Sequence, residues 1–489
     1  MKRLISCVLA LLYVMAGFAS GTWILHGKEY RVDTLYHAYI GPGTTQTSIK
    51  LAGPVNLRVF YTTTDLKNEN VDVRAIKHKD TLTGLGTVSN AAESHSTSNR
   101  SYFAGINADF FSSSMPCGIT VVDGEVYCSD QASGWSLFGI DANKIPYSGG
   151  GDFYVKLTAP DYSTAELSAM NLERGTNGLV LYSSRKGANT GTDSNGSEVV
   201  LIPDGEGNFL TPGATVRMRV QGNPSHAGSM PIPDNGYILS GSGTKESFVS
   251  NLSEGDVVEV RCAIRFNGFT GGKIQQALGG CPMLVSGGKV LDTENALDHL
   301  TSAQPRTAVG YNAEKNKLVM LVADGRSSIS VGPISKVLAD IMIYAGCSEA
   351  MNFDGGGSST FYVKGEGVIN QPSDGSERSV TDGLYLSTDA PQNDVTITTI
   401  RFMDYAKTLN QGDAYTPVIY GYNQYGVLVD RNVEGVTLSC GLSLGTITND
   451  GTTLNASGSG THMLTAGYGN LTTTLSVTVI GESGISSVD

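Results

Sequence analysis

Apolar and polar residues alternate over much of this chain, and a period of two predicts strands. The first such region covers residues 20–86, where the alternation is clearest at 57–62 and 71–76. Residues 318–323 are instead uniformly apolar, which predicts a strand buried on both faces. Short alternating segments return after residue 395, so strands are expected from one end of the chain to the other.

Two segments break this pattern and predict helices. Residues 88–99 are polar with two alanines. Residues 333–346 begin with proline, which suits the first helical position, and carry apolar residues three and four positions apart. Gly346 ends that pattern as a C-terminal cap. Strands and helices together predict an α+β main domain of mixed β-sheets with a few packed helices.

Changes in composition divide the chain into four parts. Residues 1–19 form a leader, and residues 20–386 form the main domain, which opens with the strands at 20–86. Residues 387–394 contain proline and aspartate and predict a linker. Residues 395–489 are rich in threonine and valine and poor in charge, which predicts an immunoglobulin-like β-sandwich.

The leader predicts export. Lys2 and Arg3 precede an apolar run at 4–16, and Gly17-Phe-Ala19 fits a cleavage site with small residues. We therefore expect a periplasmic, cell-surface or extracellular protein. No later segment is long and apolar enough to span a membrane. The net charge of −13, without a basic stripe, argues against nucleic acid as a partner.

Six cysteines follow the leader, and an exported protein can join such cysteines in disulfides. Cys117 and Cys128 flank a short loop and are the best candidate pair. Six buried free thiols are an equally good interpretation, because a chain of 489 residues can build a large core without cross-links. The spacing contains no Cys-x-x-Cys and fits no zinc pattern.

The richest chemistry lies in the segment at 350–360. Asn352 and Asp354 are two residues apart, so both side chains lie on one face if the segment is extended. Three glycines follow, which let another group approach the backbone closely. Hydroxyl residues come next. The candidate binding residues of this loop are Gly355, Gly356, Gly357, Ser358 and Ser359.

The same Asn-x-Asp spacing occurs earlier, at Asn107 and Asp109, again after an apolar run. A third carboxylate, Asp324, also follows an apolar strand. Aligned strand ends deliver residues that are distant in sequence to one rim. We therefore expect these groups to meet in one pocket. The cationic and hydroxyl candidates beside them are Arg306, Thr307, Arg326 and Arg378.

Several of these segments together resemble the phosphodiester glycosidase family over residues 80–387. The segments are Asn107-Ala-Asp-Phe-Phe, Gly280-Cys-Pro-Met-Leu-Val, Pro305-Arg-Thr-Ala-Val-Gly, Ala323-Asp-Gly-Arg, Asn352-Phe-Asp-Gly-Gly-Gly-Ser-Ser-Thr and Asn370-Gln-Pro-Ser-Asp-Gly-Ser-Glu-Arg. Three positions depart from the family pattern: Asp382 stands where Asn is usual, and Cys281 and Cys347 are not expected to be cysteine.

The resemblance implies an exported hydrolase that cleaves the glycosidic bond of a sugar-1-phosphodiester and releases free sugar. A phosphomonoester leaves as a stabilised anion, so the site needs cations and N–H donors more than a general acid. Arginines would bind the phosphate. The candidate catalytic residues are Asp354, Asp324, Asp109, Asn107 and Asn352, with Asp354 as first choice.

Two other functions remain open. The three aspartates suit a hard cation, which would give a metal-dependent phosphodiesterase. A surface protein that binds carbohydrate without turnover is the other alternative. No cofactor is assigned, and a divalent cation is left open. The expected partner is a glycan or sugar phosphodiester, and the C-terminal domain is a candidate for contact with glycan or another surface protein.

Overall fold

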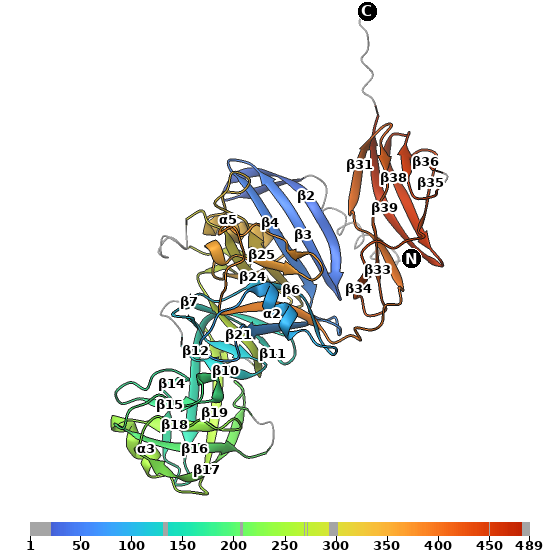
Figure 1. The fold of residues 1–489 in the computed structure, drawn as a ribbon. Helices are drawn as coiled ribbons and strands as arrows, with labels where there is room; N and C mark the ends of the chain where they lie inside the picture. The colour runs from blue at the N-terminus through green and yellow to red at the C-terminus, as the bar shows by residue number, and fades with distance from the viewer. Residues whose placement is uncertain are drawn as a thin grey trace, which may run out of the picture.

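The computed structural model describes residues 21–130, 135–205, 209–267, 269–270, 272–292, 302–448 and 450–481. The leader at residues 1–19 lies outside them. Strands dominate this part of the chain (Figure 1). Its α-helices are α2 (Val88–His95), α3 (Glu246–Ser250) and α5 (Ser335–Tyr344). Its 3₁₀ turns are η1 (Ser184–Lys186), η2 (Gly243–Lys245) and η3 (Gly356–Ser358).

The α+β assignment is wrong, because the protein is mostly β. Both predicted helices are present, as α2 and α5, but each is short. Segments that look like loops in the sequence are strands instead. β12 (Pro146–Thr158) contains three successive glycines and is still extended, because its first part pairs with β11 and its second part with β19. Pairing across a sheet thus outweighs the low strand propensity of glycine.

A nine-stranded sheet forms one layer of the main body, in the order β1-β2-β3-β4-β25-β24-β26-β22-β23. The apolar stripe of α5 packs on one face of it, through Val337, Leu338, Ile341 and Met342. The strands are β1 (Gly21–Leu25), β2 (Lys28–Gly41), β3 (Thr44–Ala52), β4 (Asn56–Asp65), β25 (Lys317–Ala323), β24 (Arg306–Tyr311), β26 (Glu349–Asn352), β22 (Met283–Ser286) and β23 (Lys289–Val290).

A five-stranded sheet covers the other face and shares a core with it. Met320 and Met351 from the large sheet pack with Ile106 and Leu384 from the smaller one. Residues 318–323 are all buried, as their uniform apolar sequence predicts, and only Lys317 at the start of this strand is exposed. The strands, in sheet order, are β28 (Gly367–Val368), β27 (Phe361–Val363), β6 (Ser101–Asn107), β29 (Asp382–Thr388) and β5 (Asp72–Lys77).

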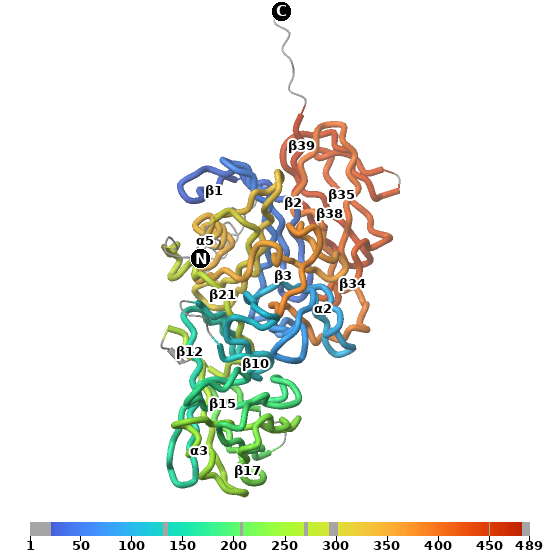
Figure 2. Tube along the Cα trace, turned by 60° about the vertical axis from the view of Figure 1, so that its left-hand side comes forward, coloured from blue at the N-terminus to red at the C-terminus, as the bar shows by residue number. Residues whose placement is uncertain are grey.

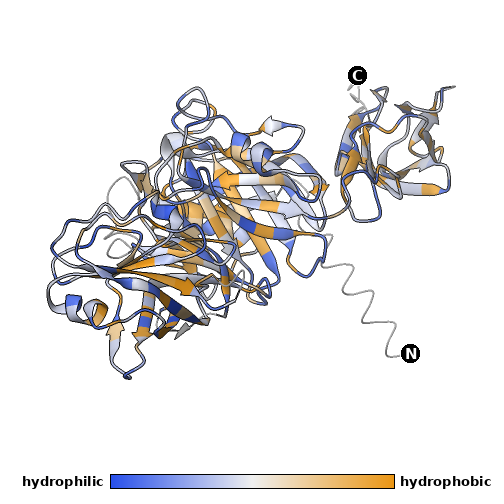
Figure 3. Ribbon diagram, turned by 60° about the horizontal axis from the view of Figure 1, so that its bottom comes forward, coloured by the Kyte–Doolittle hydropathy of each residue, from blue (hydrophilic) through white to orange (hydrophobic). Residues whose placement is uncertain are grey.

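A thirteen-stranded sheet runs from this body into a separate lobe, shown in green in Figures 1 and 2. The lobe has its own apolar core. Figure 3 shows that hydrophobic residues lie mainly along the strands. The path is β10 (Glu125–Cys128), β9 (Thr120–Val122), β21 (Ile274–Gly280), β11 (Ser136–Asp141), β12, β19 (Val257–Phe266), β17 (Thr215–Ser225), β16 (Ser197–Pro203), β18 (Tyr237–Gly241), β15 (Leu179–Tyr182) and β14 (Ala169–Met170). Off this path lie β13 (Thr164–Glu166) and β20 (Phe269–Thr270), and a small hairpin joins β7 (Phe111–Ser112) to β8 (Met115–Pro116).

The C-terminal part forms three small sheets around a core of its own. It contacts the main body where the Tyr422 hydroxyl donates to the backbone carbonyl of Tyr39 (2.8 Å) and Arg431 pairs with Glu366 (2.7 Å). The sheets are β30 (Thr399–Phe402), β33 (Ile419–Tyr422), β34 (Leu428–Asp430); β31 (Ala406–Asn410), β39 (Leu471–Ile480), β38 (Gly460–Tyr468), β35 (Thr437–Cys440); and β32 (Ala414–Tyr415), β37 (Leu454–Ala456), β36 (Gly445–Ile447).

The six cysteines after the leader are free thiols, so the Cys117–Cys128 disulfide is wrong. The alternative of six buried free thiols is confirmed for four of them, because Cys117 and Cys440 are only partly buried. Most are buried, and burial raises the pKa of Cys281 to about 11. Within the part of the chain that the structure describes, no helix is both long enough and apolar enough to cross a membrane.

Candidate functional site

The candidate site forms where three strand ends meet. β25 and β26 both pair antiparallel with β24, on its two sides, so they run in the same direction and end at the same edge. Arg306 opposes Ala323 in this register, and Ala308 opposes Asn352. The start of β24 therefore lies between the ends of the strands that lead into Asp324 and Asp354. This is the convergence that the sequence predicts.

A pocket of about 200 Å³ opens at this edge. It combines three guanidinium groups, one carboxylate and the glycine loop. Its lining residues are Phe110, Gln304, Arg306, Arg326, Asp354, Gly355, Gly356, Gly357 and Arg378. The loop glycines, the three arginines and Asp354 thus share one pocket. The expectation that Asn107, Asp109, Asp324 and Asn352 meet in the same pocket is wrong, because none of the four lines it.

Asp354 is the carboxylate of this pocket. Its backbone N–H donates to the carbonyl of Ala108 (2.8 Å), which ties the loop to the end of β6. Burial raises the pKa of Asp354 to about 6, and the Ser358 hydroxyl and the nearby Arg378 charge oppose this rise. The group is therefore ionised at neutral pH but close to its titration range.

Asn107 and Thr307 lie beneath the pocket and hold the loop in place. The Asn107 amide donates to the backbone carbonyl of Asp354 (2.7 Å). Its oxygen accepts from the Thr307 hydroxyl (2.8 Å) and from the backbone N–H of Thr360 (3.1 Å). Thr307 also donates to the hydroxyl of Ser359 (3.2 Å). All four are buried, so these predicted residues fix the loop and do not line the pocket.

The three arginines reach the pocket in different states. Arg306 is only 2% exposed and donates to the carbonyls of Ser302 (2.5 Å) and Pro333 (3.5 Å). Burial, together with the neighbouring Arg326 charge, lowers the pKa of Arg306 to about 10, so it keeps its charge. No ion pair joins Arg306 or Arg326 to a carboxylate in the described ranges. Both charges remain available to an anion.

Arg378 is already paired with Asp374 (2.6 Å) and also donates to the Ser358 hydroxyl (3.3 Å). The glycine loop makes this packing possible. A β-carbon on Gly357 would lie 2.1 Å from Nη2 of Arg378, and one on Gly356 would lie 2.9 Å from Nη2 of Arg326. Gly356 also has a φ of +62°, which side chains rarely adopt. Side chains here would push the guanidinium groups away.

Asp109 lies behind the pocket and forms a buried pair with Asp382. The Asp109 backbone N–H donates to Asp382 Oδ1 (2.9 Å), and the Gly118 N–H donates to Asp109 Oδ2 (2.7 Å). Burial and the charge of Asp382 raise the pKa of Asp109 well above its ordinary value. A β-carbon on Gly279 would lie 2.7 Å from the Asp109 carboxylate oxygens, so this glycine leaves the space for them.

Asp324 and Asn352 are buried near the pocket without lining it. Asp324 Oδ1 accepts from the Gln371 N–H (2.9 Å) and from the Asn370 amide (3.3 Å), which also bonds the carbonyl of Ser359 (3.0 Å). Burial raises the pKa of Asp324 to about 6. The Asn352 amide donates to the carbonyl of Cys281 (2.8 Å). Both side chains hold backbone in place around the pocket.

The comparisons with known proteins agree with this geometry. Residues 213–387 match the phosphodiester glycosidase family. The resemblance seen in the motifs is therefore confirmed for this part of the chain, and the match supports a hydrolase of this kind. The matched part contains all three pocket arginines, Asp354 and the glycine loop.

The chain is also similar to individual proteins and to solved structures. An uncharacterised protein of Bacillus subtilis strain 168, the SPbeta prophage-derived YomE, is 40% identical over 88 residues, which is 18% of this chain and 13% of YomE. This chain thus matches only a small part of that relative. An exported protein of Burkholderia pseudomallei K96243 has a TM-score of 0.55 at 18% identity, covering 76% of this chain and 99% of that one.

Two further structures are similar. A hypothetical protein from Synechocystis has a TM-score of 0.54 at 15% identity, covering 71% of this chain and 62% of that one. The catalytic domain of zebrafish N-acetylglucosamine-1-phosphodiester alpha-N-acetylglucosaminidase, auto-inhibited by its pro-peptide, has a TM-score of 0.36 at 12% identity, covering 72% of this chain and 87% of that one. The Burkholderia and Synechocystis structures share the fold.

The sequence did not point to three residues of the candidate site. Phe110 and Gln304 line the pocket, and Asp382 pairs with Asp109. Phe110 directly follows Asp109 in one family segment, and Gln304 directly precedes another at Pro305-Arg306. Their positions next to predicted site residues could have indicated that they line the pocket. In the sequence, Asp382 differs from the family pattern by standing where Asn is usual, but this does not indicate its pairing with Asp109.

The described residues contain no group of three or more His, Cys, Asp or Glu side chains placed to hold a metal ion. Asp109, Asp324 and Asp354 therefore do not form the shared ligand set that the metal-dependent alternative predicts. Asp324 instead faces the backbone of Gln371, and Asp109 faces Gly118.

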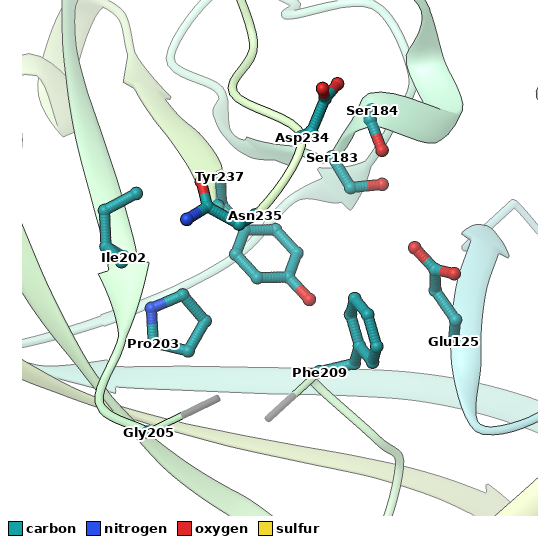
Figure 4. Close-up of a pocket in the computed structure, with 11 residues that line it drawn as sticks. Glu125, Ser183, Ser184, Ile202, Pro203, Gly205, Phe209, Asp234, Asn235 and Tyr237 are labelled. Carbon is teal, nitrogen blue, oxygen red and sulfur yellow. The ribbon is translucent and has the colours of Figure 1, made fainter. Parts of the chain in front are cut away.

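A larger cavity, of about 540 Å³, lies in the separate lobe (Figure 4). Its lining contains the carboxylates of Glu125 and Asp234 and no arginine or lysine. Phe209 and Tyr237 supply apolar walls. Glu125 is already paired with Arg185 (2.7 Å), so the lining side chains of this cavity offer a phosphate group no cation of their own. The smaller pocket around Asp354 is therefore the better candidate site for a phosphodiester.

Proposed function

We propose that this protein hydrolyses the glycosidic bond of a sugar-1-phosphodiester, giving free sugar and a phosphomonoester. One observation carries the proposal: three guanidinium groups surround a glycine loop that directly follows the buried carboxylate of Asp354. A phosphate bearing a negative charge fits the guanidinium side of this pocket, where arginine can bind two oxygens at once.

Asp354 has the position and the ionisation state for attack on the sugar. It lies at the wall shared with the arginines, so a phosphate bound there places the adjoining anomeric carbon near the carboxylate. With a pKa of about 6, Asp354 is mostly ionised at pH 7 and can act as nucleophile or as base toward water. The arginines stabilise the phosphate as it leaves as an anion, so no proton donor to the leaving group is required.

Burial and cation placement favour this reaction over the alternatives. A metal-dependent phosphodiesterase would need a shared ligand set, and Asp109, Asp324 and Asp354 are not grouped as one among the described residues. A binding protein without turnover would have no need of a desolvated carboxylate beside the arginines. A divalent cation bound together with substrate is left open as part of the proposal.

The proposal extends to the setting of the enzyme. The leader at 1–19 and the exported relative from Burkholderia support export to the periplasm, the cell surface or the outside of the cell. We propose residues 20–386 as the catalytic part and residues 395–489 as an immunoglobulin-like part. They are joined by residues 387–394, of which the first two still belong to β29. The immunoglobulin-like part is proposed to contact glycan or another surface protein.

The experiment that tests the function is a screen of sugar-1-phosphodiesters with the full chain, with and without EDTA. Free sugar and phosphomonoester are measured in the same reaction. We expect free sugar and phosphomonoester in equal amounts without EDTA, and a parallel loss of both with EDTA would show that a divalent cation takes part. Sugar 1-phosphate as product, lost on chelation, would support the phosphodiesterase instead. Saturable binding of these diesters without any product would support the binding protein.

A further inference from the structure

We propose that Phe110 is the platform on which the sugar ring stacks, so that this side chain positions the sugar for attack by Asp354. The proposal rests on the proposed function, and it assigns the two halves of the pocket. Guanidinium groups bind the phosphate, and the aromatic ring binds the sugar. The ligand class is a pyranose whose apolar C–H face lies on the ring.

The composition of the pocket carries this inference. Among its lining residues, Phe110 is the one aromatic side chain, and the others are arginines, glycines, Gln304 and Asp354. Phe110 is partly exposed, although its neighbour Asp109 is buried. An apolar ring kept open to solvent in a strongly polar pocket suits a ligand with one anionic end and one face of C–H groups.

The position of the ring is fixed from both sides of the chain. On one side, the Asp109 N–H donates to Asp382 (2.9 Å). On the other, the Cys117 N–H donates to the Phe110 carbonyl (2.9 Å), and Phe111 pairs with Pro116 in the small hairpin. A hairpin closed in this way holds the ring at the pocket wall.

Trp135 supports the same ring. The two ring centroids are 4.9 Å apart at an angle of 70°, which is the edge-to-face arrangement that aromatic pairs prefer. Trp135 comes from the chain entering β11, so a second element braces Phe110. The face of Phe110 that Trp135 does not cover is then available to the pocket.

Stacking of the sugar on Phe110 explains how substrate binding helps the reaction. If arginines held only the phosphate, the sugar would be free to rotate about the ester bond. A ring that contacts the sugar face restricts this rotation and holds the anomeric carbon beside Asp354, which lowers the entropic cost of attack. Phe110 itself takes no part in bond making.

The test measures binding, so it does not depend on turnover. The full chain and its Phe110→Leu variant are titrated by calorimetry with inorganic phosphate, glucose 1-phosphate and N-acetylglucosamine 1-phosphate. Leucine keeps apolar volume but removes the flat aromatic face. Phe110→Tyr keeps the face, and Phe209→Leu, at a half-exposed ring in the larger cavity, is the matched control.

We expect at least one sugar phosphate to bind the unaltered chain more tightly than inorganic phosphate. Phe110→Leu should remove about tenfold of this preference while leaving phosphate affinity unchanged. Phe110→Tyr and Phe209→Leu should keep the preference. The proposal is overturned if no sugar phosphate is preferred, if Phe110→Leu keeps the preference, or if it weakens phosphate binding to the same degree. A missing sugar product with the preference intact would count against the proposed reaction alone.

Discussion

The side-chain amide of Asn107 donates a hydrogen bond to the backbone carbonyl of Asp354 across 2.7 Å, although the two residues are 247 positions apart in the chain. Asn107 ends β6 in the five-stranded sheet, and Asp354 follows β26 in the nine-stranded sheet. The bond therefore joins the two packed layers at the candidate site. It fixes the start of the glycine loop and so helps to hold the Asp354 carboxylate in position relative to the arginines.

Asp354→Asn should abolish most turnover without weakening the fold. Loss of a nucleophile or base reduces turnover by about 10²–10⁴-fold. Burial raises the pKa of Asp354 to about 6, above its value of 3.8 in an unfolded chain. The stability contributed by this group is complete below the lower value and is lost as pH rises through about 6. Asparagine cannot ionise, so the variant should be equally or more stable above pH 6 in thermal unfolding.

Exposed Asp152, which pairs with Arg265 in the lobe, gives the matched control. Asp152→Asn should keep both turnover and unfolding temperature. Normal turnover in Asp354→Asn would move the chemistry to Asp109 or Asp324. Collapse of the fold in the same variant would show a structural role for the carboxylate.

The pH dependence of kcat/KM should show an acid limb near pH 6. Asp354 must be ionised to attack, and its pKa is about 6, so activity rises as pH increases through this value. The Arg378 charge lowers the pKa of Asp354. Arg378→Gln should therefore move the limb to higher pH, as measured from kcat/KM profiles on a small sugar phosphodiester. A limb that stays in place or moves to lower pH would separate Asp354 from the titration.

Arg306→Gln should weaken phosphate binding more than it affects folding. Arg306 lines the pocket, and the hydrogen bonds it makes to described residues go to the carbonyls of Ser302 and Pro333, which carry no net charge. Losing a hydrogen bond to a charged group costs about 1.5–3 kcal/mol, which is roughly 10- to 100-fold in KM. Arg306→Lys keeps the charge but loses the forked guanidinium, so its KM should lie between those of the unaltered chain and Arg306→Gln.

Arg219→Gln, at an exposed arginine of the lobe, is the control for the loss of a positive charge. Steady-state kinetics and inhibition by inorganic phosphate measure both variants. Unchanged phosphate inhibition in Arg306→Gln would remove this arginine from the anion site.

Asp324 should prove to be a positioning residue. It accepts hydrogen bonds from Gln371 and Asn370 and so anchors the turn that leads to Arg378. Asp324→Ala leaves the buried donors unpaired and should cost about 1–3 kcal/mol of unfolding free energy. Asp324→Asn keeps an acceptor oxygen and should be milder in both thermal unfolding and kcat. If Asp324→Asn lost turnover at full stability, its carboxylate would belong to the chemistry.

The sequence predicted the site best where strand direction decides it. β25 and β26 are short apolar runs ending in Asp324 and Asn352-Phe-Asp354, so their common direction around β24 brings these ends together.

Side-chain direction at the site could not be predicted in this way. Asp324 turns toward Gln371, 47 positions away, and that contact depends on how the intervening loop packs. The same holds for Phe110, whose proposed role depends on Trp135, which directly precedes β11. The α+β assignment is wrong because two clear helical patterns stand beside long strands that the sequence does not reveal. β12 is such a strand, since its glycines have low strand propensity and its pairing with β11 and β19 makes it extended.

The measurement that tests the account most directly is hydrolysis of a sugar-1-phosphodiester in ¹⁸O-labelled water, with mass analysis of the phosphomonoester. The phosphate is the better readout, because the anomeric oxygen of a free sugar exchanges with water. Attack at the anomeric carbon by Asp354 or by water leaves the sugar–phosphate oxygen on phosphorus, so the account predicts an unlabelled phosphomonoester. Label in the phosphomonoester would place the attack on phosphorus and contradict the account.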